Sequence, residues 1–515
     1  YYMFVTRSWG YWHSKDLLNW DFITPEKWYF EGCNAPAAHN YKDSVLYVCG
    51  NPSGAMSILY TDNPKRGDWK AVPSVLHDLQ DPALFIDDDE RAYMYWGSSN
   101  RWPIRGKELD MKNKFLPIAK KPDSLLFLRP DIHGWERFGE NHTSDIKPFI
   151  EGAWMTKHNG KYYLQYAAPG TQFNVYGDGV YVGKSPLGPF EYAAHNPFCY
   201  KPGGFATGAG HGSTVCGPGG IYWHFGTIHL SINYKFERRL CMFPTFFDED
   251  GAMYSDTYFG DYPHYSPDQV SRQTTSGGFR GWMLLSYGKP VKASSQLESY
   301  PVENVTDENL KTFWVAEKND DKQWVEIDLE EVSDVYALQL NFFDYEETGF
   351  WGRMPNLRQR YLVEASVDGA RWRVLVDYRN SFRDAPHNYI ELDQPIEARY
   401  IRYRHHYVPG KNLAMGDIRV FGLGRGKKPA TVKGFTVVRE ADERNARISW
   451  KAVKGAQGYN VLWGVALDKL YSSWMVYGDN SLDLRALTVG QKYYFAIESF
   501  NENGISQRVF LREAH

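Results

Sequence analysis

Short apolar runs alternate with polar turns along most of the chain, and the period of two within many runs predicts β-strands. Pairs of runs joined by a polar or glycine-containing turn are typical of β-hairpins, as in FIDDDERAYMYWG (85–97), WMTKHNGKYYLQYA (154–167) and CGPGGIYWHFG (216–226). Such hairpins recur about every 50 residues through roughly the first 265 residues. This spacing favours a β-propeller of four or five blades.

The pattern changes after a polar stretch at 266–278. The strands that follow alternate well enough for a β-sandwich, and a basic linker at 422–430 then precedes a last segment. That segment has a candidate core residue, Trp450, and glycine turns at the spacing of a second sandwich. We therefore predict an all-β chain of three domains, at 1–270, 280–424 and 431–515.

The composition removes several classes of function. The 515 residues contain no apolar run near the roughly 20 residues that a membrane helix needs, which excludes a membrane span. The 58 Lys and Arg residues and 62 Asp and Glu residues give a net charge of −4 without blocks of either sign, which argues against a nucleic-acid partner. Five cysteines without CxxC spacing indicate neither a disulfide framework nor a zinc site. The aromatic content of 16% suits a protein that stacks sugars on its rings.

Paired carboxylates are the simplest chemistry for such a chain, because glycosidic hydrolysis needs one protonated and one ionised carboxyl group. Asp81 stands directly before Pro82 at the start of a predicted strand, and Glu151 opens the next hairpin in the same way. Strand starts of a propeller line its central funnel, so both side chains could share one pocket. A turn-capping Asp81 and a solvated Glu151 remain the alternative.

The ordered motifs DPALFIDDDERAYMYWG, EGAWMTKHNGKYYLQYAAPGT, GAGHGST and RRLCMFPTFFDEDGAMY resemble the five-bladed propellers of glycoside hydrolase family 43. The resemblance covers about 1–265 and implies inversion with three carboxylates. It implies that Glu151 is the general acid and that Asp81 tunes this acid and positions substrate, since a neighbouring anion raises the pKa of a carboxylic acid. The general base is expected on a strand upstream of Tyr1. The family's WAP-Asp element is altered to Asn34–Ala37, so its polar partner is lost.

The same resemblance implies further site residues. His211 in GAGHGST resembles a histidine on the propeller axis that contacts a metal ion or its water shell, although a structural histidine is the alternative. Arg239 resembles a substrate-contacting arginine, with a surface arginine as the alternative. Candidate stacking walls for a sugar are Trp9, Trp96 and Trp154, each of which could instead pack in the core.

The middle domain resembles discoidin or coagulation factor 5/8 type C jelly rolls, through SYGKPVKASS, VTDENLKTFW, QWVEIDLEE and GDIRVFG. In such domains the VTDENLKTFW loop holds a structural Ca²⁺, which implies Asp307 and Thr312 as ligands and Asp417 as a nearby acidic residue. An Asx turn at Asp307 is the alternative. Phe350 and Trp351 are a candidate sugar platform, with burial against the propeller as the alternative. The last domain resembles fibronectin type III, with Tyr493 as its corner tyrosine.

These expectations combine into an inverting exo-glycoside hydrolase of plant-type polysaccharide side chains, an α-L-arabinofuranosidase. A β-xylosidase or exo-β-galactosidase of the same family is the first alternative, and a catalytically inactive carbohydrate-binding or adhesion protein is the second. No organic cofactor is expected, and the partner is an oligo- or polysaccharide. The protein is expected to be a secreted or periplasmic monomer.

Overall fold

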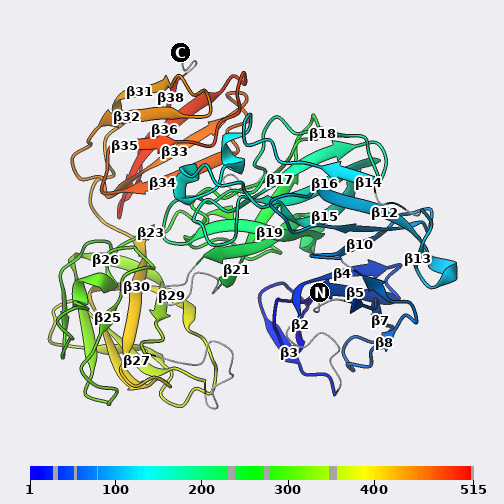
Figure 1. Cartoon of the computed structure of the whole chain (residues 1–515). Coiled ribbons are helices and arrows are strands. Elements are labelled where there is room, and N and C mark those ends of the chain that lie inside the picture. Colours follow the sequence, from blue (N-terminus) through cyan, green and yellow to red (C-terminus); the bar gives the residue numbers. More distant parts are fainter. Residues whose placement is uncertain are drawn as a thin grey trace.

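The computed structural model describes residues 1–26, 33–51, 55–77, 79–119, 121, 123–229, 238–271, 278–346 and 357–511 (Figure 1). Within these residues the helices are single 3-10 turns and the remaining regular structure is β-strand, so the predicted all-β class is confirmed. The 3-10 turns are η1 (Met111–Asn113), η2 (Gly134–Glu136), η3 (Glu140–His142), η4 (Pro218–Gly220) and η6 (Val302–Val305). None of the helices in this part of the chain is long and apolar enough to cross a membrane.

Five antiparallel sheets follow one another in the first domain, and each is built from one local stretch of the sequence. The first sheet contains β1 (Tyr2–Met3), β2 (Tyr11–Ser14) and β3 (Trp20–Ile23). The second contains β4 (Asn34–Tyr41), β5 (Val45–Asn51), β7 (Leu59–Thr61) and β8 (Lys70–Ala71). The third sheet contains β10 (Ala83–Ile86), β11 (Ala92–Trp96), β12 (Ile104–Asp110), β13 (Leu116–Pro117) and β14 (Asp123–Leu126). The fourth contains β15 (Glu151–His158), β16 (Lys161–Ala168), β17 (Gly177–Gly183) and β18 (Phe190–Tyr192). The fifth sheet contains β19 (Thr207–Cys216), β20 (Tyr222–His229), β21 (Arg238–Phe247) and β22 (Met253–Ser255). A separate pair, β6 (Ala55–Met56) with β9 (Leu76–His77), lies beside the second sheet.

Each sheet shares a hydrophobic core with both of its neighbours. Tyr11 and Val48 join the first two sheets, and Cys49 and Met94 join the next two. Tyr95 and Leu164 share the core between the third and fourth sheets, and Tyr163 and Phe243 share the core between the fourth and fifth. Trp223 of the fifth sheet packs with Leu17, which lies between β2 and β3 of the first. Because the fifth sheet packs on the first, the sheets close into the ring of a five-bladed propeller.

One face of this ring carries the starts of the first strands of its blades. β10 begins just after Asp81, and β15 begins at Glu151. Since the strands are antiparallel, the loop between the second and third strands of a blade returns to the same face. We call this side the entrance face; in the third blade its loop is 97–103, and in the fourth blade it is 169–176.

The second domain is a β-sandwich in which eight strands form a continuous hydrogen-bonded network. Its strands are β23 (Met283–Leu284), β24 (Val291–Ala293), β25 (Trp314–Val315), β26 (Trp324–Phe342), β27 (Arg360–Ser366), β28 (Arg373–Asp377), β29 (His387–Tyr407) and β30 (Ala414–Leu423). The long strand β26 lies between β29 and β30 and pairs with both, with register shifts in each ladder. Its core includes the fully buried Trp314 and Val325.

The third domain has two facing sheets. One sheet contains β31 (Lys433–Arg439), β32 (Ala446–Lys451) and β35 (Ser481–Leu484). The other contains β34 (Ser472–Tyr477), β33 (Gly458–Gly464), β36 (Tyr494–Asn501), β37 (Gly504–Ile505) and β38 (Val509–Leu511). Trp450 is buried between them, as expected. The Tyr493 hydroxyl accepts a hydrogen bond from the Thr488 amide at 3.2 Å, which is the contact of a corner tyrosine. Membership of the fibronectin type III family itself stays a prediction.

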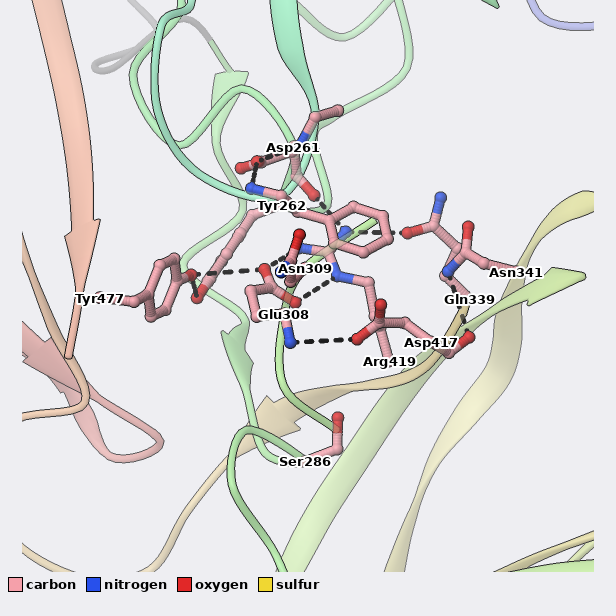
Figure 2. Close-up of polar contacts among 12 residues, drawn as sticks. Asp261, Tyr262, Ser286, Glu308, Asn309, Gln339, Asn341, Asp417, Arg419 and Tyr477 are labelled. Carbon is pink, nitrogen blue, oxygen red and sulfur yellow. Dashed lines mark hydrogen bonds and ion pairs between the residues drawn. The ribbon is translucent and has the colours of Figure 1, made fainter. Parts of the chain in front are cut away.

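All three domains meet at a buried arginine, as Figure 2 shows. Arg419 on β30 binds the Glu308 carboxylate through two nitrogens, at 2.9 and 2.6 Å. It also donates to the Asp261 carbonyl of the propeller domain at 2.7 Å. Tyr477 of the third domain donates to Glu308 at 3.4 Å, and its hydroxyl lies 2.7 Å from that of Tyr262. We call these residues the three-domain junction.

A second contact joins the third domain to the propeller through segment 129–142, which lies between the third and fourth blades. The Gly134 amide donates to the Leu487 carbonyl at 2.8 Å, and Arg137 donates to the Arg485 carbonyl at 2.7 Å. The propeller core and the core of the third domain are continuous here. The third domain is therefore anchored beside the strand that begins with Glu151 (Figure 1).

Candidate active site

Asp81 lies at the entrance face, just before β10. Its backbone has a φ of +49°, a left-handed conformation that costs energy for a residue other than glycine. Only 8% of the residue is exposed. The turn is held by the Gly97 amide, which donates to the Gln80 carbonyl at 2.8 Å. Because its backbone turn is fixed and its side chain is short and buried, the Asp81 carboxylate has little freedom to move.

Glu151, the first residue of β15, is held by two hydroxyl groups from different blades. Ser98, in the loop after β11, donates to its Oε2 atom at 3.0 Å. Tyr176, just before β17, donates to its Oε1 atom at 2.7 Å. Because both carboxyl oxygens have a fixed partner, the side chain has one preferred orientation.

His211 lies on β19, where the register with β20 shifts. Its φ is +54°, and its amide donates to Asp178 Oδ1 at 2.7 Å while the Gly212 amide donates to Asp178 Oδ2 at 2.9 Å. Asp178 is completely buried and lies 3.1 Å from His224 Nε2. The hydrogen bonds continue from His224 Nδ1 through Thr214 to Gln165. A buried polar chain thus supports the strained backbone of His211.

These elements bring Asp81, Glu151 and His211 together. One ligand-type atom from each lies within 4.8 Å of the other two, and His211 Nδ1 is 4.0 Å from Asp81 Oδ2. Gly152 allows this approach, since a Cβ atom there would stand 3.0 Å from the His211 backbone and ring, at a φ of +66°. We call the three residues the entrance cluster. Two carboxyl groups and an imidazole therefore share one small region of the entrance face.

A metal ion bound by all three residues of the entrance cluster is not compatible with Glu151 as a general acid. One imidazole nitrogen and two carboxylate oxygens could bind a divalent cation. A cation bound to all three would hold Glu151 ionised and so prevent it from donating a proton. We therefore derive no step through a metal here, and the axial metal predicted beside His211 stays a prediction.

The predicted substrate-binding residues lie in different settings. Trp9 is 47% exposed, in the loop between β1 and β2, where the Arg7 amide donates to the Cys33 carbonyl just before β4. Trp96 is buried in the core between the second and third blades, which leaves little of its ring for a sugar. Trp154 is partly buried and donates to the Thr214 carbonyl at 3.2 Å. Arg239, the second residue of β21, lies close enough to the second domain that, after burial, its charge also lowers the pKa of His387.

Sequence reasoning missed Ser98, Tyr176 and Asp178. Asp178 carried a usable signal, since it is a lone acid in the apolar stretch of β17. Ser98 and Tyr176 carried none, because they reach Glu151 from loops of separate hairpins. The predicted platform residues Phe350 and Trp351 lie outside the described residues.

The predicted Ca²⁺ ligands of the second domain lie beside the three-domain junction. Asp307 accepts hydrogen bonds from Thr312 Oγ1 at 2.6 Å and from the Asn309 amide at 3.0 Å, as in an Asx turn. Asp417 is 1% exposed, and its Oδ2 atom has no hydrogen-bond partner among the described residues. Burial, followed by the charges of Glu308 and Asp307, holds the pKa of Asp417 well above its usual value. A buried acceptor oxygen without a donor fits a cation at this position.

Comparison with known families now decides the class of the first two domains. Residues 1–253 match the model of glycosyl hydrolases family 43, and residues 290–415 match that of the F5/8 type C domain. Residues 1–253 are a family 43 glycosyl hydrolase domain. The entrance cluster therefore belongs to a domain of a glycosidase family, and the F5/8 type C domain follows it.

Curated relatives of the family 43 domain differ in the activities that their names give. A beta-xylosidase of Xylanibacter ruminicola is 33% identical over 133 residues, 22% of this chain and 39% of that protein. An arabinoxylan arabinofuranohydrolase of Bacillus subtilis (strain 168) is 30% identical over 189 residues, 32% of this chain and 34% of that protein. The matched segment thus spans less than half of these relatives. A solved glycoside hydrolase structure, 19% identical, covers 80% of this chain and 90% of its own, with a TM-score of 0.43.

Proposed function

We propose that the protein is an inverting exo-glycoside hydrolase that removes sugar side chains from plant-type polysaccharides, as an α-L-arabinofuranosidase. The observation that supports this function is the entrance cluster, in which a carboxyl group held by two hydroxyls faces a second carboxylate and an imidazole. Glu151 would protonate the glycosidic oxygen, and Asp81 would orient the sugar and the acid. An inverting reaction also needs a general base that deprotonates the attacking water.

A β-xylosidase of the same mechanism is a second candidate, because the relative from Xylanibacter ruminicola carries that name. A galactosidase is the third candidate considered from the sequence. Since the cluster contains no feature that selects among these sugars, hydrolysis of a panel of nitrophenyl glycosides by the full-length protein would distinguish them. Binding to polysaccharide without hydrolysis of any glycoside would instead support the inactive carbohydrate-binding protein.

The test of the acid is Glu151→Gln, which keeps the shape of the side chain and removes the transferable proton. We expect turnover of oligosaccharides to fall by about 10²–10⁴-fold, the usual contribution of acid catalysis. Nitrophenyl glycosides should lose less, because their leaving group needs little protonation. Glu191→Gln, on the outer strand β18 of the same blade, is the matched control. An equal loss on both classes of substrate would remove Glu151 as the acid.

We also propose that the second domain binds one Ca²⁺ through Asp307, Thr312 and Asp417. The support is the buried Asp417 oxygen without a donor and its closeness to the charge of Asp307. A chelator should lower the melting temperature of the wild-type protein, because an ion that binds only the folded state stabilises it. Asp417→Asn should respond less to the chelator. Melting curves that are the same in EDTA and in calcium would contradict the proposal.

A polymeric substrate cannot enter a cell intact, so we propose that the protein acts as a secreted or periplasmic enzyme. We propose a monomer, which sedimentation of the full-length protein would test. No organic cofactor is part of the proposed reaction, because the proton transfers need only carboxyl groups and water.

A further inference from the structure

The loop 97–103 of the third blade touches the residues next to both carboxylates of the entrance cluster. At its start, the Gly97 amide donates to Gln80, the residue before Asp81, and the Ser98 hydroxyl donates to Glu151 itself. Ser99 forms two backbone hydrogen bonds with Ile150, the residue before Glu151, both at 3.0 Å. The same loop continues through Trp102 before β12 begins at Ile104.

Trp102 is 60% exposed, which is far more than Trp96 on the preceding strand. Its position is nevertheless fixed. The Ser99 hydroxyl accepts hydrogen bonds from the amides of Arg101 and Trp102, at 2.9 and 3.1 Å. Pro103 and Ile104, which follow, are buried. The Arg105 guanidinium lies 5.4 Å from the centre of the Trp102 ring and covers part of it. A large ring is therefore held in place with much of its surface in water.

We propose that Trp102 forms the binding site for the leaving-group saccharide, the part of the polysaccharide that departs when Glu151 donates its proton. This inference rests on the proposed function. A general acid lies beside the glycosidic oxygen, so the departing sugar must pass the residues that flank the acid on the open side. Loop 97–103 is such a flank, since Ser98 touches Glu151 and Ser99 touches Ile150. The apolar C–H face of a neutral pyranose can stack on a rigid, exposed indole ring.

The ring also has a consequence for substrate choice. An aryl glycoside presents a small, activated leaving group and gains little from an extended sugar platform. A branched xylo-oligosaccharide presents several backbone sugars beyond the bond that breaks. Trp102 is therefore a specificity-determining residue for polymeric over small substrates, distinct from the residues that transfer protons.

The test compares wild type with Trp102→Ala and Trp102→Phe in the full-length protein. Substrates are an arabinose-substituted xylo-oligosaccharide and nitrophenyl α-L-arabinofuranoside. We expect Trp102→Ala to lower kcat/KM roughly tenfold on the oligosaccharide, mainly through KM, as expected for the loss of one aromatic contact. The aryl glycoside should lose clearly less, since its single small ring can make only part of that contact and its departure needs little help. Trp102→Phe should restore most of the loss. Phe510→Ala removes a comparably exposed ring from the third domain and is the control.

Equal losses on both substrates, or none on either, would overturn the inference. If the wild type hydrolyses neither substrate, the proposed function fails but the inference still has its own test. Calorimetric titration with the same xylo-oligosaccharide should then show weaker binding for Trp102→Ala than for wild type and for Phe510→Ala. Identical titrations for all three proteins would overturn it.

Discussion

At the residue scale, the entrance cluster depends on partners that come from several blades. The sequence pattern predicted Asp81 and Glu151, because each stands where a hairpin begins. It could not predict Ser98 or Tyr176, since their contact with Glu151 requires neighbouring hairpins to be packed into a ring. Asp178 differs, because a lone acid in an apolar strand is a signal in itself, but its two backbone partners on the next blade could not be predicted. Local spacing thus predicts the position of an acid but not the groups that orient it.

Tyr176→Phe should separate orientation from acidity at Glu151. The change removes the hydroxyl that donates to Glu151 Oε1 and leaves only the bond from Ser98. The loss of one hydrogen bond to the acid should lower kcat by about tenfold, with little change in KM. Rates on an oligosaccharide and on a nitrophenyl glycoside measure this, and the loss should be larger on the first. Tyr181→Phe, within β17, is the control. A change confined to KM would show that Tyr176 contacts substrate instead.

At the element scale, the hairpins followed from their period of two, whereas segment 129–142 did not. This segment is irregular apart from η2 and η3, and it makes its hydrogen bonds with a domain more than 300 residues away in the sequence. Asn141 links the two regions. Its side chain donates to the Asp483 carbonyl at 3.2 Å, and its amide donates to Asn174 in the loop that carries Tyr176, at 3.4 Å. A segment without a repeat thus connects the third domain to the loop that orients the acid.

Glu136, in η2, makes the stability of this segment depend on pH. The residue is completely buried, and its carboxyl accepts hydrogen bonds from the Tyr166 hydroxyl and the Arg129 amide. Burial raises the pKa of Glu136 to about 8. An unfolded glutamate has a pKa of about 4.3, so the folded protein keeps a proton that the unfolded chain releases between these values. The stabilising contribution is therefore complete below about pH 4 and is lost as the pH rises to about 8.

Glu136→Gln should flatten that dependence, because an amide keeps an acceptor oxygen and cannot ionise. We expect the melting temperature of the variant to exceed that of wild type at pH 8. At pH 5 the difference should be much smaller. Thermal melts at both values measure the difference. Glu191→Gln, an exposed carboxyl of the same domain, should show no such trend. Parallel melting temperatures for wild type and Glu136→Gln across this range would show that Glu136 does not hold the proton.

At the scale of the whole molecule, three β domains followed from changes in the sequence pattern, but their union did not. The three-domain junction combines Asp261 and Tyr262 with Glu308, Arg419 and Tyr477, from four segments of the chain that give no separate sign of it (Figure 2). An arginine in the strand GDIRVFG gives no sign of its partners, because they come from other domains. Once assembled, the junction buries an ion pair whose side chains are 2% and 1% exposed. The domains therefore share one set of buried charges and should unfold together.

Arg419→Met tests this coupling. The change leaves the buried Glu308 carboxylate without its partner and removes the bond to the Asp261 carbonyl, so we expect a loss of about 3–5 kcal/mol in the free energy of unfolding. The control is Arg399→Met in the same domain, whose bidentate pair with Asp328 is similar in length but partly exposed. That change should cost about 1 kcal/mol or less. Because Arg419 joins the propeller to the second domain, calorimetry should also resolve separate transitions in Arg419→Met where the wild type shows one. A single transition with a loss equal to that of Arg399→Met would show that the domains are joined by their apolar contacts alone.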